Sequence, residues 1–231
     1  GRWEPALRHL ELYEDVEFPE PETLHDDFEG RSKAPTVHLM GIANDMGPHR
    51  LMLEYSSKFT PEKLAEFDGY YKPRNAVYLE GNLSEEEKIS WQYQRYIKNY
   101  LKCVKAVDEN VGRILDYLDE SGLAENTVVM YSSDQGFYLG EHGWFDKRWM
   151  YEESFRTPLL VRWPGAVEKA VVNDEDLVSN LDFLPTFLEM AGLPIPEDIQ
   201  GDSMVPILKG ETPDDWRTTH YYHYYESGGH G

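Results

Sequence analysis

The chain has 231 residues, of which 40% are hydrophobic and 13% aromatic, so it can form a folded core and is not wholly disordered. Acidic residues outnumber Lys and Arg by 43 to 22, which gives a formal net charge of -21. A surface this acidic argues against binding to nucleic acid or to anionic membranes, because both require basic side chains. It is compatible with a protein that holds a divalent cation.

No apolar run approaches the roughly 20 residues that a membrane span needs. The N-terminal sequence GRWEP has neither an initiator Met nor the basic and apolar regions of a signal peptide. We therefore expect the chain to be a piece of something longer.

Residues 1–83 carry few signals of regular structure. Residues 1–30 are acidic and punctuated by prolines, which predicts an extended surface strap. Residues 31–83 are expected to be irregular, with turns at Gly47-Pro48 and Lys72-Pro73 and a short helix at 61–68.

A long helix is predicted next. Ser84 and Glu87 form the sequence pattern of a capping box at its start. Apolar residues then recur every three or four positions as far as Leu118, and Gly122 is a suitable C-terminal stop. Cys103, the single cysteine, lies within this helix, where we interpret it as a packing residue; it excludes an internal disulfide.

An alternating pattern of strands and helices follows. Residues 127–131 and 158–163 predict two buried strands, and a helix is predicted near 180–191 before Gly192. The order helix, strand, polar loop, strand, helix is typical of an α/β sheet.

Two residues beyond the first predicted strand can bind a metal. Ligands in open α/β sheets lie beyond the carboxyl ends of the strands, where Asp134 and Gln135 are expected. A carboxylate beside a carboxamide offers hard oxygen ligands, which suit Ca²⁺ or Mg²⁺. An ordinary turn at the end of a strand has the same residue types, so the residues alone leave both interpretations open.

The loop over residues 136–149 combines glycines, aromatic residues and charged residues, as pocket-forming loops do. Lys147 can bind an anionic oxygen, or it can be a solvated lysine beside Asp146 and Arg148. His142 can donate a proton, or it can be a structural residue of a Gly-rich loop.

Residues 133–147 (SDQGFYLGEHGWFDK) and 151–161 (YEESFRTPLLV) resemble the C-terminal signature of type I sulfatases, in the alkaline-phosphatase-like superfamily. The resemblance extends to residues 19–24, 96–112 and 182–186, with Ala191-Gly192. It implies a three-layer α/β/α sandwich that is incomplete here, lacking its N-terminal part and C-terminal subdomain. Residues 1–231 then form a single partial catalytic domain, with residues 84–231 carrying the long helix, the α/β portion and the site motif.

The resemblance also implies roles for particular residues. Asp134 and Gln135 complete the site of a divalent cation, Ca²⁺ or alternatively Mg²⁺, and Lys147 binds the sulfate oxygens and assists ester cleavage. His142 is a second expected substrate-binding residue. The formylglycine nucleophile of the family comes from a Cys/Ser-X-Pro-X-Arg motif. Cys103 is followed by VKA and does not fit it, so the nucleophile is expected upstream and this chain alone is expected to be inactive.

The function implied is hydrolysis of a sulfate ester, with a sulfated small molecule or carbohydrate as substrate. Two alternatives remain: a phosphate or phosphonate ester hydrolase of the same superfamily, or a non-catalytic acidic domain that binds cations or a partner. Members of the family are commonly exported, but neither the compartment nor the particular ester follows from these residues. We expect the Asp134 carboxylate and the Lys147 amine to lie within about 10 Å, a distance that a bound cation and anion bridge.

Overall fold

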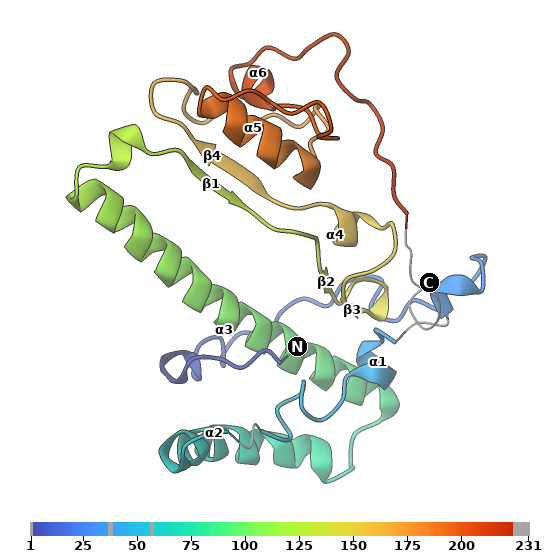
Figure 1. Ribbon diagram of the computed structural model, residues 1–231. Helices are drawn as coiled ribbons and strands as arrows, with labels where there is room; N and C mark the ends of the chain where they lie inside the picture. Colours follow the sequence, from blue (N-terminus) through green and yellow to red (C-terminus); the bar gives the residue numbers. More distant parts are fainter. Residues whose placement is uncertain (1, 37–38, 56–57, 224–231) are drawn as a thin grey trace. The chain divides into compact units, whose positions relative to one another are not determined.

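The computed structural model of the protein describes residues 2–36, 39–55 and 58–223, which form two compact units (Figure 1). Unit 1 consists of the described residues in 1–117 and 135–156, and unit 2 of those in 118–134 and 157–224. None of the helices that the structure describes is long and apolar enough to cross a membrane.

The described part of the N-terminal strap, residues 2–30, is irregular, with one short 3-10 helix, η1 (Leu7–His9). It is not confined to the surface, because Leu10 and Leu24 are buried in unit 1. A second 3-10 helix, η2 (Ala34–Thr36), and a one-turn helix, α1 (Ile42–Asp45), follow it.

Helix α2 (Pro61–Leu79) corrects the prediction of a short helix at 61–68 and a turn at Lys72-Pro73. The helix begins as expected, with the Thr60 side chain accepting the Lys63 N–H. It continues through Pro73, which lacks the N–H of a helical residue. The carbonyl of Tyr70, in the turn before Pro73, accepts a hydrogen bond from the Arg74 side chain at 2.8 Å. Burial of one face holds the helix together across the proline, and that face comprises Phe67, Tyr70, Tyr71 and Asn75.

Helix α3 (Glu85–Glu120) confirms the predicted long helix. The Glu87 N–H donates to Ser84 Oγ at 3.2 Å, and the Glu87 carboxylate accepts the Ser84 N–H at 2.8 Å, which completes the capping box. Gly122, with φ of 71°, terminates the helix in the left-handed region. The helix starts in unit 1, and its last residues belong to unit 2.

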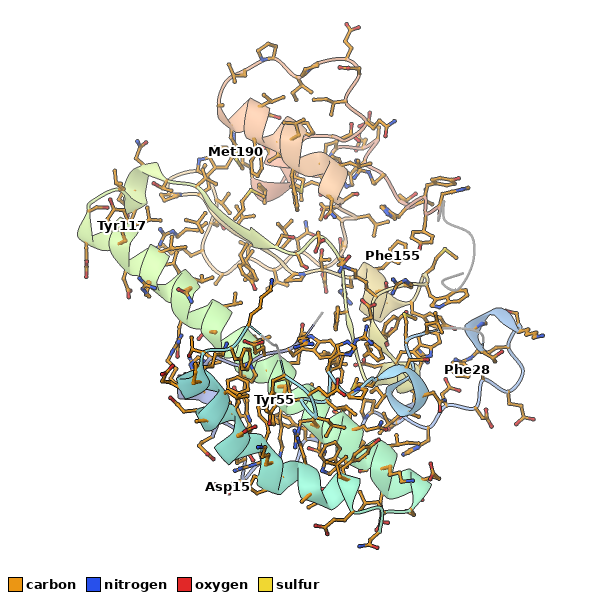
Figure 2. The ribbon with its side chains drawn as sticks, turned by 60° about the horizontal axis from the view of Figure 1, so that its bottom comes forward. Asp15, Phe28, Tyr55, Tyr117, Phe155 and Met190 are labelled. Atoms are coloured by element: carbon orange, nitrogen blue, oxygen red, sulfur yellow. The ribbon has the colours of Figure 1, made fainter. Side chains whose placement is uncertain are left out.

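The core of unit 1 lies where the strap, α2 and α3 pack together (Figures 1 and 2). One cluster of buried residues contains Leu24, Ile42, Met46, Leu51, Tyr93, Tyr96, Ile97 and Phe145. A second contains Leu10, Met52, Phe67, Tyr70 and Tyr71. Tyr55, labelled in Figure 2, packs against this second cluster. Because Phe145 belongs to the first cluster, the loop that carries the predicted site is part of this core.

Both predicted strands are present in unit 2. Strand β1 (Val129–Ser132) pairs antiparallel with β4 (Leu159–Arg162), with Val129 opposite Arg162. The prediction that both strands are buried is wrong for this chain, since Tyr131 is 43% exposed and Leu160 is 64% exposed. Within the described residues the β1–β4 sheet has only these two strands, so its apolar side chains are incompletely covered.

The predicted helix near 180–191 is also confirmed. A 3-10 turn, η5 (Asn180–Asp182), leads into α5 (Phe183–Met190), and Gly192 follows with φ of 68°. A one-turn helix, α6 (Val205–Leu208), completes the regular structure of unit 2. The aromatic run at 220–225 is described only as far as His223.

Candidate functional site

Asp134 follows strand β1 in unit 2, at the strand end where the sequence predicts a metal ligand. Its backbone carbonyl accepts the Asn180 side-chain amide at 2.8 Å, which ties this turn to the start of η5. The Asp134 side chain is exposed, and it forms no ion pair within the described part of the chain. An exposed carboxyl group of this kind is a suitable ligand for a hard cation.

Gln135 is the first residue of the segment that returns to unit 1. The next residue, Gly136, donates its N–H to the Ser154 carbonyl at 2.8 Å. A Cβ at position 136 would lie 2.1 Å from the Glu153 carbonyl oxygen, so only glycine permits this approach to α4 (Glu152–Phe155). The position of the Gln135 backbone is therefore fixed by its neighbour.

We expect Gly136→Ala to destabilise the protein by about 1–3 kcal/mol, because the new methyl group meets backbone atoms that cannot rotate away. Urea denaturation measures the change. Gly69→Ala is the matched control: a Cβ there has no neighbour within 4 Å, and alanine is favoured in a helix interior. An unchanged free energy of unfolding for Gly136→Ala would contradict this account of the turn.

A small hairpin in unit 1 carries His142 and leads to Lys147. Strand β2 (Tyr138–Leu139) pairs antiparallel with β3 (Phe145–Asp146), and the turn between them contains η4 (Glu141–Gly143). Three non-glycine residues here have positive φ: His142 at 57°, Asp146 at 76° and Trp149 at 69°. L-residues seldom adopt this region, and such strained residues cluster at functional sites.

His142 is held from three sides. Its N–H donates to Thr23 Oγ1 at 2.9 Å, and its Nδ1 lies 3.1 Å from Asp26 Oδ2. Its ring packs 4.5 Å from that of Tyr151 and 5.4 Å from that of Trp144. The His142 side chain is 12% exposed, so it is both an anchor of the loop and a group that solvent reaches.

Lys147 directly follows β3, and its side chain is partly exposed. Its two neighbours pair with each other, since Arg148 Nη1 lies 2.7 Å from Asp146 Oδ2. Within the residues that the structure describes, the Lys147 amine has no hydrogen bond or ion pair. Its charge is therefore available to an anionic ligand, which is compatible both with the predicted sulfate-binding role and with the alternative of a solvated lysine.

Cys103 behaves as the predicted packing residue. Burial raises the pKa of its thiol to about 11, so the neutral thiol predominates at pH 7. This is unfavourable for a nucleophile.

Three of the four predicted site residues belong to the same compact unit. Gln135, His142 and Lys147 lie in unit 1, whereas Asp134 is the last residue of a segment of unit 2. The expected distance between Asp134 and Lys147 stays a prediction. No group of three or more His, Cys, Asp or Glu side chains among residues 2–36, 39–55 and 58–223 can hold a metal, so the assignment of Asp134 and Gln135 to a cation site also stays a prediction.

Sequence reasoning missed the strap residues that hold the loop, namely Thr23 and Asp26. Asp26 is 116 positions from His142, and no local pattern links them. Thr23 falls within residues 19–24, which share the family resemblance of the loop, whereas Asp26 lies outside them.

A family model described as the C-terminal part of N-sulphoglucosamine sulphohydrolase matches residues 140–230. The chain is 47% identical over 242 residues to an N-acetylglucosamine-6-O-sulfatase of Bacteroides thetaiotaomicron, covering 97% of this chain and 43% of that protein. A solved structure of a protein in complex with its substrate, D-glucosamine-2-N,6-O-disulfate, matches with a TM-score of 0.93 and 44% identity. That match covers 97% of this chain and 49% of the other. A phosphonate monoester hydrolase from Silicibacter pomeroyi matches 59% of this chain and 26% of its own, with a TM-score of 0.53 and 32% identity.

These similarities and the mixed helix and sheet structure define an α/β protein of the alkaline-phosphatase-like superfamily, as predicted. Within that superfamily the chain belongs to the sulfatase family, and it corresponds to the C-terminal part of the catalytic domain. It spans less than half the length of the sulfatase and the solved structure that it matches over 97% of its own residues.

Proposed function

We propose that the full-length protein carrying this chain is a sulfatase that hydrolyses a 6-O-sulfate ester of a glucosamine-containing carbohydrate. The observation that carries the proposal is the 47% identity to an N-acetylglucosamine-6-O-sulfatase, which extends over 97% of this chain. The matched solved structure with a disulfated glucosamine as its substrate supports the same class of substrate. That same match supports a single partial catalytic domain built from both units.

We assign four residues to the proposed site. Asp134 and Gln135 supply oxygen ligands to Ca²⁺ or Mg²⁺, and the cation, when bound, neutralises part of the charge on the sulfate group. The Lys147 ammonium binds sulfate oxygens, because it is a compact charge without a partner among the described residues. His142 forms a hydrogen bond with the substrate from the loop between β2 and β3.

The nucleophile of the proposed reaction is a formylglycine supplied from outside this chain. The Cys103 thiol is unsuited to the role, since it lies in α3 and burial raises its pKa to about 11. The contribution of this chain is therefore to position the sulfate group and to compensate its charge.

The proposal is tested with the full-length protein, 6-O-sulfated N-acetylglucosamine and a phosphonate monoester. We expect sulfate release, with much slower hydrolysis of the phosphonate. Faster cleavage of the phosphonate would overturn the assignment in favour of the relatives represented by the Silicibacter enzyme.

Asp134→Asn is expected to raise the Ca²⁺ concentration needed for half-maximal sulfate release. Loss of a group that hydrogen-bonds to a metal ligand lowers metal affinity roughly 10–100-fold. Loss of a ligand itself should raise the required Ca²⁺ concentration by at least this factor. Asp174→Asn, at an exposed position of unit 2, makes the same change in charge and is the control. Equal Ca²⁺ requirements for the two variants would show that Asp134 is not a ligand.

A further inference from the structure

The strap turn, residues 23–31, contacts the loop that carries His142 in several independent ways. Thr23 Oγ1 accepts the His142 N–H, and the Leu24 carbonyl oxygen lies 2.8 Å from the place of a Cβ at Gly143. The Phe28 ring, labelled in Figure 2, stacks on Trp144 at 5.4 Å with an interplanar angle of 19°. The orientation of this loop therefore depends on the strap turn.

Asp26 is the charged residue at the centre of these contacts. Its Oδ1 accepts the Phe28 N–H at 2.9 Å, and its Oδ2 lies 2.7 Å from Arg31 Nη1 and 3.1 Å from His142 Nδ1. Burial raises the pKa of Asp26, but the Phe28 and His142 hydrogen bonds and the charge of Arg31 outweigh it and lower the pKa. The Asp26 side chain is therefore a carboxylate at neutral pH, and a carboxylate only accepts hydrogen bonds.

When the His142 ring carries a single proton, this pairing decides which nitrogen holds it. Because Asp26 cannot donate, the proton lies on Nδ1, which leaves Nε2 as an acceptor. Tyr151 and Trp144 pack against the ring and restrict its rotation. Within the described residues His142 Nε2 has no hydrogen bond, and it is not among the buried side-chain atoms that lack a partner.

We propose that Asp26 is a positioning residue that holds His142 with its proton on Nδ1, so that Nε2 accepts a hydrogen bond from a hydroxyl group of the carbohydrate. This inference rests on the sulfatase function proposed above. It divides the recognition of the substrate between two residues of the same loop. The Lys147 ammonium binds the anionic sulfate oxygens, whereas His142 accepts a hydrogen bond from an uncharged hydroxyl group of the sugar.

The matched pair of variants for the test is Asp26→Asn and Asp27→Asn. Both remove one negative charge, and both residues accept a backbone N–H two positions ahead, from Phe28 and Glu29 respectively. Asp27 is exposed, whereas the Asp26 side chain is 11% exposed and pairs with His142. A difference between the variants therefore reports the contacts of Asp26 with His142 and Arg31, and the tautomer of His142 distinguishes between the two.

The full-length protein, labelled with ¹⁵N-histidine, gives the tautomer of His142 directly, with His142→Gln to assign the signal. The wild type and Asp27→Asn are expected to show the Nδ1–H tautomer of the neutral ring, and Asp26→Asn a mixture of tautomers. In kinetics with the 6-O-sulfated sugar, Asp26→Asn should raise KM about tenfold with kcat within about twofold, as loss of one ground-state hydrogen bond does.

A wild-type His142 ring with its proton on Nε2 would overturn the inference, even if Asp26→Asn fails to fold. An unchanged KM in a folded Asp26→Asn variant would also overturn it, while wild-type sulfate release leaves the proposed function intact. A fall of kcat in step with Tm, at constant KM, would show that Asp26 only stabilises the fold. If the wild type releases no sulfate from any ester, the proposed function and this inference fail together.

Discussion

Replacing Lys147 with alanine should lower the kcat of the full-length protein roughly 10²–10³-fold, with little change in its Tm. One charged group that stabilises a transition state contributes about this much to rate. The Lys147 side chain is partly exposed and has no ion pair among the described residues, so its removal costs little folding energy. Sulfate release from 6-O-sulfated N-acetylglucosamine and thermal unfolding measure the two effects.

Two further variants sharpen this test. Lys147→Arg should restore activity only in part, because a planar guanidinium does not reproduce a compact ammonium. Lys169→Ala removes an exposed lysine of unit 2 and should leave kcat and Tm unchanged. If Lys147→Ala instead loses Tm and activity in parallel, Lys147 is a structural residue.

Replacing Lys102 with methionine should destabilise the protein by about 3–5 kcal/mol, the usual cost of removing one partner of a buried ion pair. Lys102 is buried in α3, and its amine donates to the Leu10 carbonyl at 2.7 Å, to Glu14 Oε1 at 2.8 Å and to the Tyr70 hydroxyl at 2.6 Å. It thus joins the strap, α2 and α3. Lys105→Met breaks only an exposed pair with Asp108, and urea denaturation should show a loss below about 1 kcal/mol.

The effect of Lys102→Met should also depend on pH. Burial raises the pKa of Glu14, but hydrogen bonds from Lys102, Tyr70 and Arg74 outweigh it and lower the pKa to about 2. Because the folded value lies below the unfolded value of 4.5, this stabilisation is present above pH 4.5 and is lost as pH falls toward 2. The difference between wild type and variant should therefore shrink over that range, and a constant difference would contradict the role of Glu14.

The parts of the fold that sequence predicted well are those determined by neighbouring residues. Ser84 and Glu87 cap α3 through contacts three positions apart, and Gly122 stops it through its own conformation. Helix α2 was underestimated because Pro73 is a local signal against a helix, whereas burial of aromatic residues against other elements favours one. A pattern of neighbouring residues contains the proline but not the burial against distant elements, so it cannot predict which of the two effects is larger.

The candidate site likewise contains residues that a local pattern predicts and one that it does not. Asp134, Gln135, His142 and Lys147 are predicted as site residues because they fall in one short segment that resembles a known family. Asp26 was not identified, because its contact with His142 joins positions 116 residues apart. What orients a site residue is set by tertiary structure, which composition and spacing do not encode.

The strap turn and the loop that carries His142 are joined by contacts, although they are synthesised at different times. Glu14, Tyr70 and Lys102 are all translated before the hairpin of β2 and β3. The hydrogen bonds of Lys102 that join the strap to α2 and α3 can therefore form before the hairpin is synthesised. At about 5–20 residues per second, His142 is translated roughly 6–23 s after Asp26. The strap turn is therefore already synthesised when the loop that carries His142 leaves the ribosome, and the loop can form its contacts with Thr23 and Asp26 at once.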